Sequence, residues 1–206
     1  MLQNRVHPSG DLIKTKARGT WMGTRGLIHN NQQEIVRAFK HKTWITCKLE
    51  FKGRRRKVMT PNLYTELFFL DEATAFSAGH RPCCECRRAE FDLFKQLWIE
   101  ANPAYGFSIK TRIHEIDAII HAERIDRKNK KITYEEKIST LPDGAFILVD
   151  NVAYVVKAKK MHRWRESGYE PAVPLPAEIR ITVLTPRSIV NTFRAGYIPQ
   201  IGLIPG

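Results

Sequence analysis

The first regular pattern in the chain is an alternation of apolar and polar positions over residues 43–51, TWITCKLEF. Such alternation, with β-branched and aromatic residues, is typical of a strand that buries one face. A second run of β-forming residues, TELFFL at 65–70, predicts another strand. Residues 1–31 have weak periodicity and several glycines, which indicates an N-terminal arm or a set of loops.

Helical signals follow these two strands. Asp71 is a good N-cap for a short helix, DEATAFSA, and Gly79 is a good residue to end it. A second helix is predicted from about Arg87 to Glu100, and a third from about 110 to 127. The second helix carries an apolar face made of Phe91, Phe94, Leu97 and Trp98.

The last third of the chain returns to β-structure. Residues 145–150, AFILVD, and 152–158, VAYVVKA, predict a hairpin with Asp150 and Asn151 at its turn. A further strand is predicted at 179–185, and a short last helix begins after it at Thr185-Pro186 and ends at Gly196. The pattern as a whole therefore predicts an α+β fold, with two β-rich regions separated by helices.

The charge of the chain changes the functional picture. Lys and Arg number 34 against 21 Asp and Glu, so the net charge is +13. Such a field favours polyanions, and it predicts contact with nucleic acid. No stretch approaches the roughly 20 apolar residues of a membrane helix. Residues 1–16 lack the apolar core of a secretory signal, so we expect a cytoplasmic protein without a membrane partner.

Four cysteines add a chemical signal, because three of them fall within four residues. In a reducing compartment, a Cys-x-x-Cys pair with a distant further cysteine is typical of a metal site. Two thiolates three residues apart can both reach one tetrahedral Zn²⁺ at about 2.3 Å. The expected cofactor is therefore Zn²⁺, held by the Cys-x-x-Cys at Cys83 and Cys86.

The surroundings of this pair resemble a known family. Residues 78–86, AGHRPCCEC, come after an aromatic run at 68–69 and a short alanine-rich helix. This order is similar to the zinc-binding N-terminal domain of the Ada alkylation-repair proteins, which shows Ala-Gly-aromatic-Arg-Pro-Cys-x-x-Cys at the same place. The resemblance covers about residues 47–88, with His80 at the aromatic position. It implies a small hairpin-and-helix core around zinc, contact with DNA and a role in DNA repair.

The resemblance also implies a ligand set, which this chain meets only in part. The Ada family takes its other two zinc ligands from a Cys-x-x-x-Cys, whereas this chain has Cys47 with Phe51 four residues later. A fourth ligand is then needed, for which His80 and His41 are the leading candidates and His29, His7 and Cys84 are further options. The candidate ligands are Cys47, Cys83 and Cys86, with His80 or His41 as the fourth.

Cys47 could also inherit the family's chemistry, in which a metal-bound thiolate accepts a methyl group from a DNA phosphotriester. Three thiolates and a neutral histidine leave a formal charge of −1 around zinc, against −2 for four thiolates. A less basic thiolate is less nucleophilic. We therefore expect Cys47 to be a ligand and not a methyl acceptor.

Basic residues near the cysteines are candidate phosphate contacts. A basic run at 54–57 is expected at a hairpin tip, and an arginine pair directly follows the second cysteine of the Cys-x-x-Cys. A solvated turn that protects a sheet edge explains the run equally well. The candidate nucleic-acid contacts are Arg54, Arg55, Arg56, Lys57, Arg87 and Arg88.

A separate set of candidates lies on the third predicted helix. His114, Asp117 and His121 fall on one face at helical spacing, where Asp117 could orient His121 for acid–base or hydrolytic chemistry. An ordinary solvent-facing set of polar residues is the favoured explanation. The chain could therefore be an enzyme acting on nucleic acid, through this face or through Cys47, and it could also be a module that binds a protein partner.

Three regions result from this reading. Residues 1–31 form an arm or loops, residues 32–104 an Ada-like zinc-binding region, and residues 105–206 a helix followed by β-structure. We expect the last two regions to pack as one unit. The leading hypothesis is a zinc-binding protein that binds nucleic acid through a mainly structural metal site.

Overall fold

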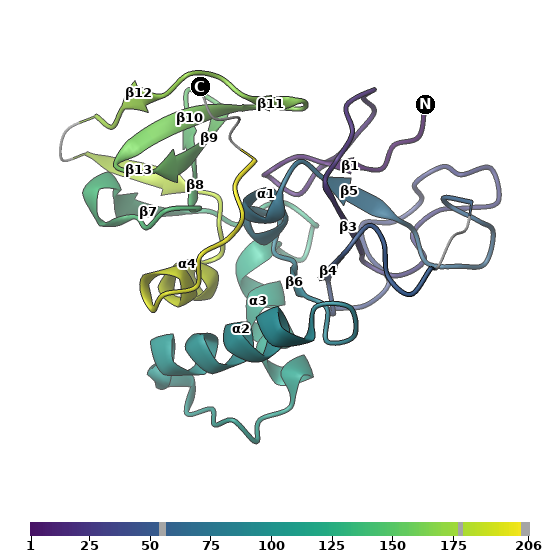
Figure 1. The fold of residues 1–206 in the computed structure, drawn as a ribbon, viewed down its shortest axis with the longest axis horizontal. Helices are drawn as coiled ribbons and strands as arrows, with labels where there is room; N and C mark the ends of the chain where they lie inside the picture. Colours follow the sequence, from purple (N-terminus) through teal and green to yellow (C-terminus); the bar gives the residue numbers. More distant parts are fainter. Residues whose placement is uncertain (54–56, 177–178, 203–206) are drawn as a thin grey trace.

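The computed structural model describes residues 1–53, 57–176 and 179–202. These ranges contain two β-sheets and four α-helices, which confirms the predicted α+β class. The sheets lie on opposite sides of the molecule, and the short first helix lies between them (Figure 1).

The first sheet is built from the N-terminal part of the chain, with six short strands in the order β2-β1-β5-β3-β4-β6. Its strands are β1 Arg5–Val6, β2 Leu12–Ile13, β3 Trp21–Thr24, β4 Ile45–Cys47, β5 Leu67–Phe69 and β6 Arg81–Pro82. Most neighbours pair antiparallel, but β1 with β5 and β4 with β6 pair parallel. The predicted strands at 43–51 and 65–70 are therefore present, with shorter bounds.

Residues 1–31 differ from the expected arm or loops, because they supply β1, β2 and β3. These strands have two to four residues, too few for alternation to show in the sequence. Their order comes from distant partners, since Arg5 pairs with Phe68 and Trp21 pairs with Phe69 on β5. The segment also supplies buried core residues such as Val6.

The second sheet has seven strands, with β12 paired on β10 beside the path β11-β10-β9-β8-β13-β7. Its strands are β7 Tyr134–Lys137, β8 Phe146–Val149, β9 Val152–Lys157, β10 Lys160–Arg165, β11 Gly168–Tyr169, β12 Val173–Pro174 and β13 Arg180–Val183. The predicted hairpin is β8–β9, and Asp150 and Asn151 at its turn have φ of 48° and 61°. Positive φ at both turn residues is the property that Asn and Asp tolerate best.

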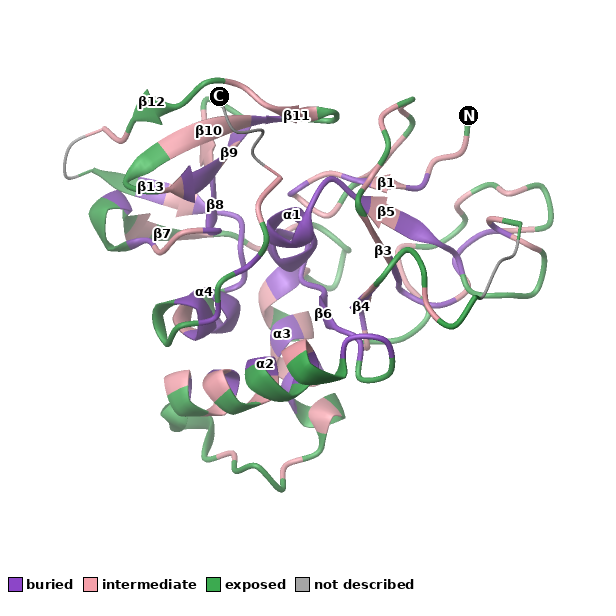
Figure 2. Ribbon diagram, in the orientation of Figure 1, coloured by how far each residue is buried: buried purple, intermediate pink, exposed green. Residues whose placement is uncertain are grey.

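The helices are α1 Glu72–Ser77, α2 Arg88–Ala101, α3 Ile113–Arg124 and α4 Arg187–Arg194. α1 begins as predicted, because Asp71 Oδ1 accepts a hydrogen bond from Thr74 N at 2.7 Å. The chain leaves α1 at Gly79 with φ +85°, where a side chain would also collide with Arg124. α1 is buried over its whole length (Figure 2). Helix α3 is shorter than the predicted 110–127.

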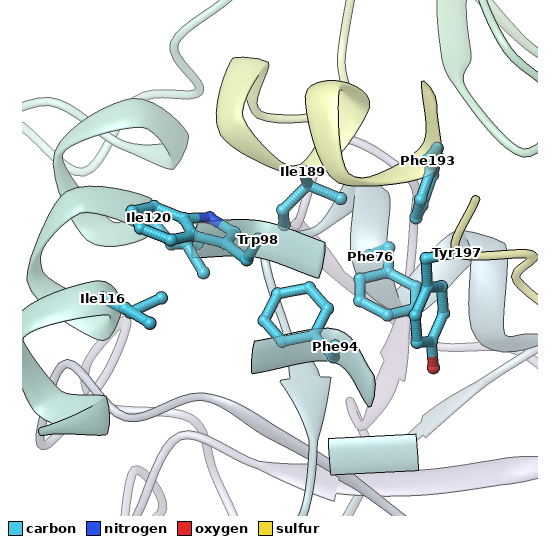
Figure 3. Packing of buried hydrophobic residues seen from close by; sticks show 8 residues of the cluster. All are labelled: Phe76, Phe94, Trp98, Ile116, Ile120, Ile189, Phe193 and Tyr197. Atoms are coloured by element: carbon cyan, nitrogen blue, oxygen red, sulfur yellow. The ribbon is translucent and has the colours of Figure 1, made fainter. Parts of the chain in front are cut away.

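The four helices share one core, shown in Figure 3. Phe76 of α1 stacks on Phe94 of α2 with ring centroids 5.6 Å apart and meets Phe193 of α4 edge-on at 5.2 Å. The other members of this core are Trp98, Ile116, Ile120, Ile189 and Tyr197. The core therefore joins residues from both sides of the predicted division near residue 104. Among the described helices, none combines the length and apolar character needed to cross a bilayer.

Candidate metal centre

The parallel pairing of β4 with β6 brings two distant cysteines together. Cys47 is the last residue of β4, and Cys83 directly follows β6. Thr46 pairs with Pro82, and Cys83 N donates to Thr46 O at 3.0 Å. Because the two strands run in the same direction, their cysteines arrive at the same end of the sheet edge.

A tight turn then brings the third cysteine to the same place. Arg87 N donates to Cys83 O at 3.2 Å, and α2 begins at the next residue. The Sγ atoms of Cys47, Cys83 and Cys86 all lie within 4.8 Å of one another. Cys83 and Cys86 are buried, Cys47 is half-buried, and the neighbouring Cys84 is exposed and outside this group. We call these three cysteines the thiol cluster.

Backbone N–H groups point at the sulfur atoms of the cluster. Glu85 N donates to Cys83 Sγ at 3.4 Å, and the Lys48 N–H donates to Cys86 Sγ. The Cys47 thiol and the backbone donors lower the pKa of Cys83 to about 5, and they lower the pKa of Cys86 as well. Hydrogen bonds to the other two sulfurs, together with burial, raise the pKa of Cys47.

This donor set fits a thiophilic divalent metal. Three sulfurs on a tetrahedral zinc, each at about 2.3 Å, lie about 3.8 Å apart, well inside the 4.8 Å spread of the cluster. Thiolates are the ligand form of cysteine, and N–H···S hydrogen bonds stabilise that form. The cluster can therefore hold a metal ion with Cys47, Cys83 and Cys86 as ligands.

The two histidines proposed for the fourth position lie outside the thiol cluster. His80 is fully buried, packs against the rings of Trp44 at 5.1 Å and Phe69 at 4.7 Å, and its Nε2 accepts from Arg25 Nε at 3.3 Å. Burial, followed by the nearby charge of Arg25, holds the pKa of His80 well below its usual value. His41 is exposed. Within the described parts of the chain, the cluster offers three protein ligands, and a tetrahedral metal there would need a fourth ligand from another source.

The structure does not assemble His114, Asp117 and His121 into one site. Asp117 is buried and forms a two-point ion pair with Arg81, with Oδ1 2.7 Å from Nε and Oδ2 2.8 Å from Nη2. His121 Nδ1 instead faces Arg124 Nη2 at 2.7 Å, and burial followed by that charge lowers the pKa of His121 to about 4. His114 is exposed. The three side chains share a helix but have different partners.

The Arg81–Asp117 ion pair connects α3 to the thiol cluster. The sequence analysis did not predict this ion pair. Arg81 is 3% exposed, and its Nη1 also donates to Pro82 O at 2.9 Å, one residue before Cys83. Thr43 Oγ1 donates to the same carboxylate at 2.9 Å. The ion pair with Asp117 of α3 therefore holds residues 81–82, the segment that leads into Cys83, in place. The available signal in the sequence was a charged Asp117 among the apolar residues 116–120, which indicates a buried carboxylate in need of a partner.

The candidate phosphate contacts have different surroundings. Arg54, Arg55 and Arg56 lie outside the described residues, and Lys57 is exposed. Arg87 is 1% exposed, donates from Nη2 to Glu72, and stacks on Trp21 at 4.2 Å, so its charge faces the interior. Arg88 is exposed and pairs with Asp92 at 3.0 Å. Of the arginine pair after the cysteines, only Arg88 reaches solvent.

Compared with known proteins, the chain matches no family model, no curated protein and no solved structure. The resemblance of residues 47–88 to the Ada zinc domain therefore stays a prediction from sequence. What the thiol cluster can do follows from the chemistry of its own residues.

Proposed function

We propose that this chain is a zinc-binding protein that binds nucleic acid, and that the zinc stabilises the fold of its binding surface. The observation that carries the proposal is the convergence of three thiols from β4, the end of β6 and the start of α2 within 4.8 Å. Soft thiolate ligands in tetrahedral arrangement select zinc among the common divalent ions.

A structural role for the metal is supported by what it would connect. Cys47 belongs to the edge of the first sheet, and Cys86 leads into α2, whose residues Phe94 and Trp98 lie in the helical core. A metal bound to both would join the first sheet to the helices. Metal binding of this kind contributes directly to the free energy of folding.

The same geometry supports Cys47 as a ligand rather than a methyl acceptor. As a whole residue, Cys47 is half-buried, whereas Cys83 and Cys86 are buried. With three thiolates and a neutral fourth ligand, the metal–sulfur unit carries a formal charge of −1, which lowers the nucleophilicity of each thiolate. Position 51 is Phe, so the second thiolate of the Ada pattern is missing there.

The distribution of charge supports the nucleic-acid partner. Residues 1–60 contain 14 Lys and Arg against three Asp and Glu, so they carry +11 of the net charge of +13. These residues include β1 to β4 and Cys47. Lys48 and Lys52, which follow Cys47 in the sequence, are exposed. A strongly basic N-terminal segment that contains one of the proposed metal ligands is the property expected of a surface that contacts phosphates.

Affinity for duplex DNA is expected to fall steeply with salt, with a log–log slope near −0.9 for each phosphate neutralised. Replacing all four residues of the basic run at 54–57 with Gln should make this slope shallower by up to about 3.6, since each phosphate contact that is lost leaves about 0.9 counterion on the DNA. Fluorescence anisotropy at a series of salt concentrations measures the slope for both proteins. The same titration with RNA compares the two nucleic acids.

A matched control removes the same charge from the second sheet. Lys137, Lys159, Lys160 and Arg180 are exposed, and they are replaced with Gln together. We expect this variant to keep the wild-type slope. An equal change of slope in both variants would show that the binding depends on total charge and would contradict a binding surface within residues 1–60.

A further inference from the structure

A cavity of about 350 Å³ lies where several distant segments of the chain meet. Its wall includes the turn between β1 and β2, Arg25 after β3, Trp44 before β4 and Lys131 after α3. The volume falls in the range of small-molecule sites, about 300–1,000 Å³. None of the three cysteines lines it, so a ligand here is independent of the metal centre.

Two buried guanidinium groups, those of Arg25 and Arg124, pack on the indole of Trp44, and Arg25 and Trp44 both line the cavity. Arg25, which is 3% exposed, has its guanidinium carbon 3.9 Å from a Trp44 ring centroid. Arg124, which is 1% exposed, has the corresponding carbon 3.6 Å from a Trp44 ring centroid. Lys131 is half-buried in the wall itself. Cation–π contact stabilises the two guanidinium charges in part but does not neutralise them.

Carboxylates act on these charges only at longer range, Asp11 on Arg25 and Lys131, and Asp117 on Arg124. Within the described ranges, no Asp or Glu oxygen lies within 4.0 Å of the cationic nitrogens of Arg25, Arg124 or Lys131. Their hydrogen bonds go mainly to uncharged backbone carbonyls, those of Gly10, Lys42, Ser77 and Gly79. Burial, followed by the charges of Arg25 and Arg124, lowers the pKa of Lys131 to about 7. Buried positive charge of this kind is costly without an anion.

Donors remain free to bind an anion at the cavity wall. No described residue accepts a hydrogen bond from Arg25 Nη1, and Lys131 Nζ uses one donor, to Ser77 O at 2.5 Å. Asp11 is the one carboxylate among the described wall residues, and it is exposed, with Oδ2 accepting from Ser9 Oγ at 2.7 Å. The wall therefore presents more positive than negative charge to the cavity.

We propose that this cavity binds the phosphate monoester of a small molecule of mononucleotide size. The guanidinium fork of Arg25 matches phosphate oxygens, and Lys131 supplies a second charge to a dianion. Polar side chains such as Gln3 and Asn129 share the rest of the wall with apolar side chains, which suit the organic part of such a ligand. The apolar side chains are Leu12, Ile35, Ala38 and Ala78.

The phosphate monoester can come from two sources, a free mononucleotide or the 5′-phosphate end of a nucleic-acid strand. Isothermal titration of the full chain with adenosine 5′-monophosphate, adenosine and inorganic phosphate tests the shared chemistry. We expect saturable binding of the monophosphate, weaker binding of phosphate and none of adenosine. Titration with one oligonucleotide, with and without its 5′-phosphate, then separates the sources. A higher affinity for the oligonucleotide with the 5′-phosphate, lost in Lys131→Met, would identify the strand end as the source of the phosphate monoester.

Three variants separate binding from folding. Lys131→Met is expected to weaken binding of the monophosphate about tenfold, because it removes a charged hydrogen bond. Asp11→Asn is expected to strengthen it about threefold, because it removes a repelling charge at the wall. Lys160→Met removes the same charge as Lys131→Met from the second sheet, outside the cavity wall, and should leave affinity within about twofold.

Two results would overturn the proposal. One is a monophosphate that binds no better than adenosine. The other is binding that neither Lys131→Met nor Asp11→Asn changes, which would leave the buried cations with only their carbonyl and indole partners. Since Asp11 is exposed, its variant tests the site even if Lys131→Met fails to fold.

Discussion

Replacing Cys83 or Cys86 with Ser is expected to lower the melting temperature by roughly 8–16 °C, whereas Cys84→Ser leaves it nearly unchanged. A metal present at about 1,000 times its dissociation constant stabilises the folded state by about 4.1 kcal/mol. Each kcal/mol corresponds to about 2–4 °C in a chain of this size. Cys83 and Cys86 belong to the thiol cluster, and Cys84 is exposed outside it. Calorimetry of the purified variants measures the difference.

The exposed neighbour makes this comparison sharp, because all three variants make the same chemical change within four residues. Because Cys83 and Cys86 are also buried while Cys84 is exposed, the part of the difference that a chelator reproduces in the wild-type protein is the part due to the metal. Equal damage from all three changes would contradict the proposed ligand set. Added zinc should not restore the melting temperature of Cys83→Ser or Cys86→Ser. A chelator should lower the melting temperature of the wild-type protein.

Asp117→Asn is expected to cost about 3–5 kcal/mol of stability, because it leaves the buried guanidinium of Arg81 without a counter-charge. The pair is nearly inaccessible to solvent, with Arg81 3% and Asp117 2% exposed. Asp92→Asn breaks the exposed pair with Arg88 and is the matched control, with an expected cost below about 1 kcal/mol. Urea denaturation of the two variants measures both costs.

A double variant separates a structural role from a catalytic one. Arg81→Met with Asp117→Leu removes both charges and keeps apolar volume, so it should recover much of the stability lost in Asp117→Asn. If Asp117→Asn left stability unchanged, the ion pair would not fix the approach to the cysteines. Asp117 would then again be a candidate for the chemistry that its place beside His121 suggested in the sequence.

Local signals in the sequence were enough for several elements. Asp71 and Gly79 set the start and end of α1, and Asp150 and Asn151 set the β8–β9 turn, because each acts through its own backbone or its near neighbours. The Cys-x-x-Cys predicted two members of the thiol cluster for the same reason. The place of Cys47 beside the other two cysteines depends on the pairing of β4 with β6, which no local pattern in the sequence encodes.

Other features depend on tertiary contacts that no local pattern encodes. The strands at residues 1–31 owe their order to β5, far along the chain. His80 could be placed near the cysteines by spacing, but its ring turns into a pocket formed by Trp44, Phe69 and Arg25. The buried arginines could not be predicted from the sequence either, because the stacking of Arg124 on Trp44 joins residues 80 positions apart. The spacing of residues in the sequence shows which residues lie close along the chain, but it does not show which way their side chains point.

The metal content of the purified full chain tests the central claim most directly. Native mass spectrometry of protein produced without added metal is predicted to show about one zinc per chain. The zinc should be absent from Cys47→Ser, Cys83→Ser and Cys86→Ser and retained in Cys84→Ser, since only the first three positions belong to the thiol cluster. A wild-type chain that is folded and free of metal, with the same melting temperature after zinc is added, would contradict the account.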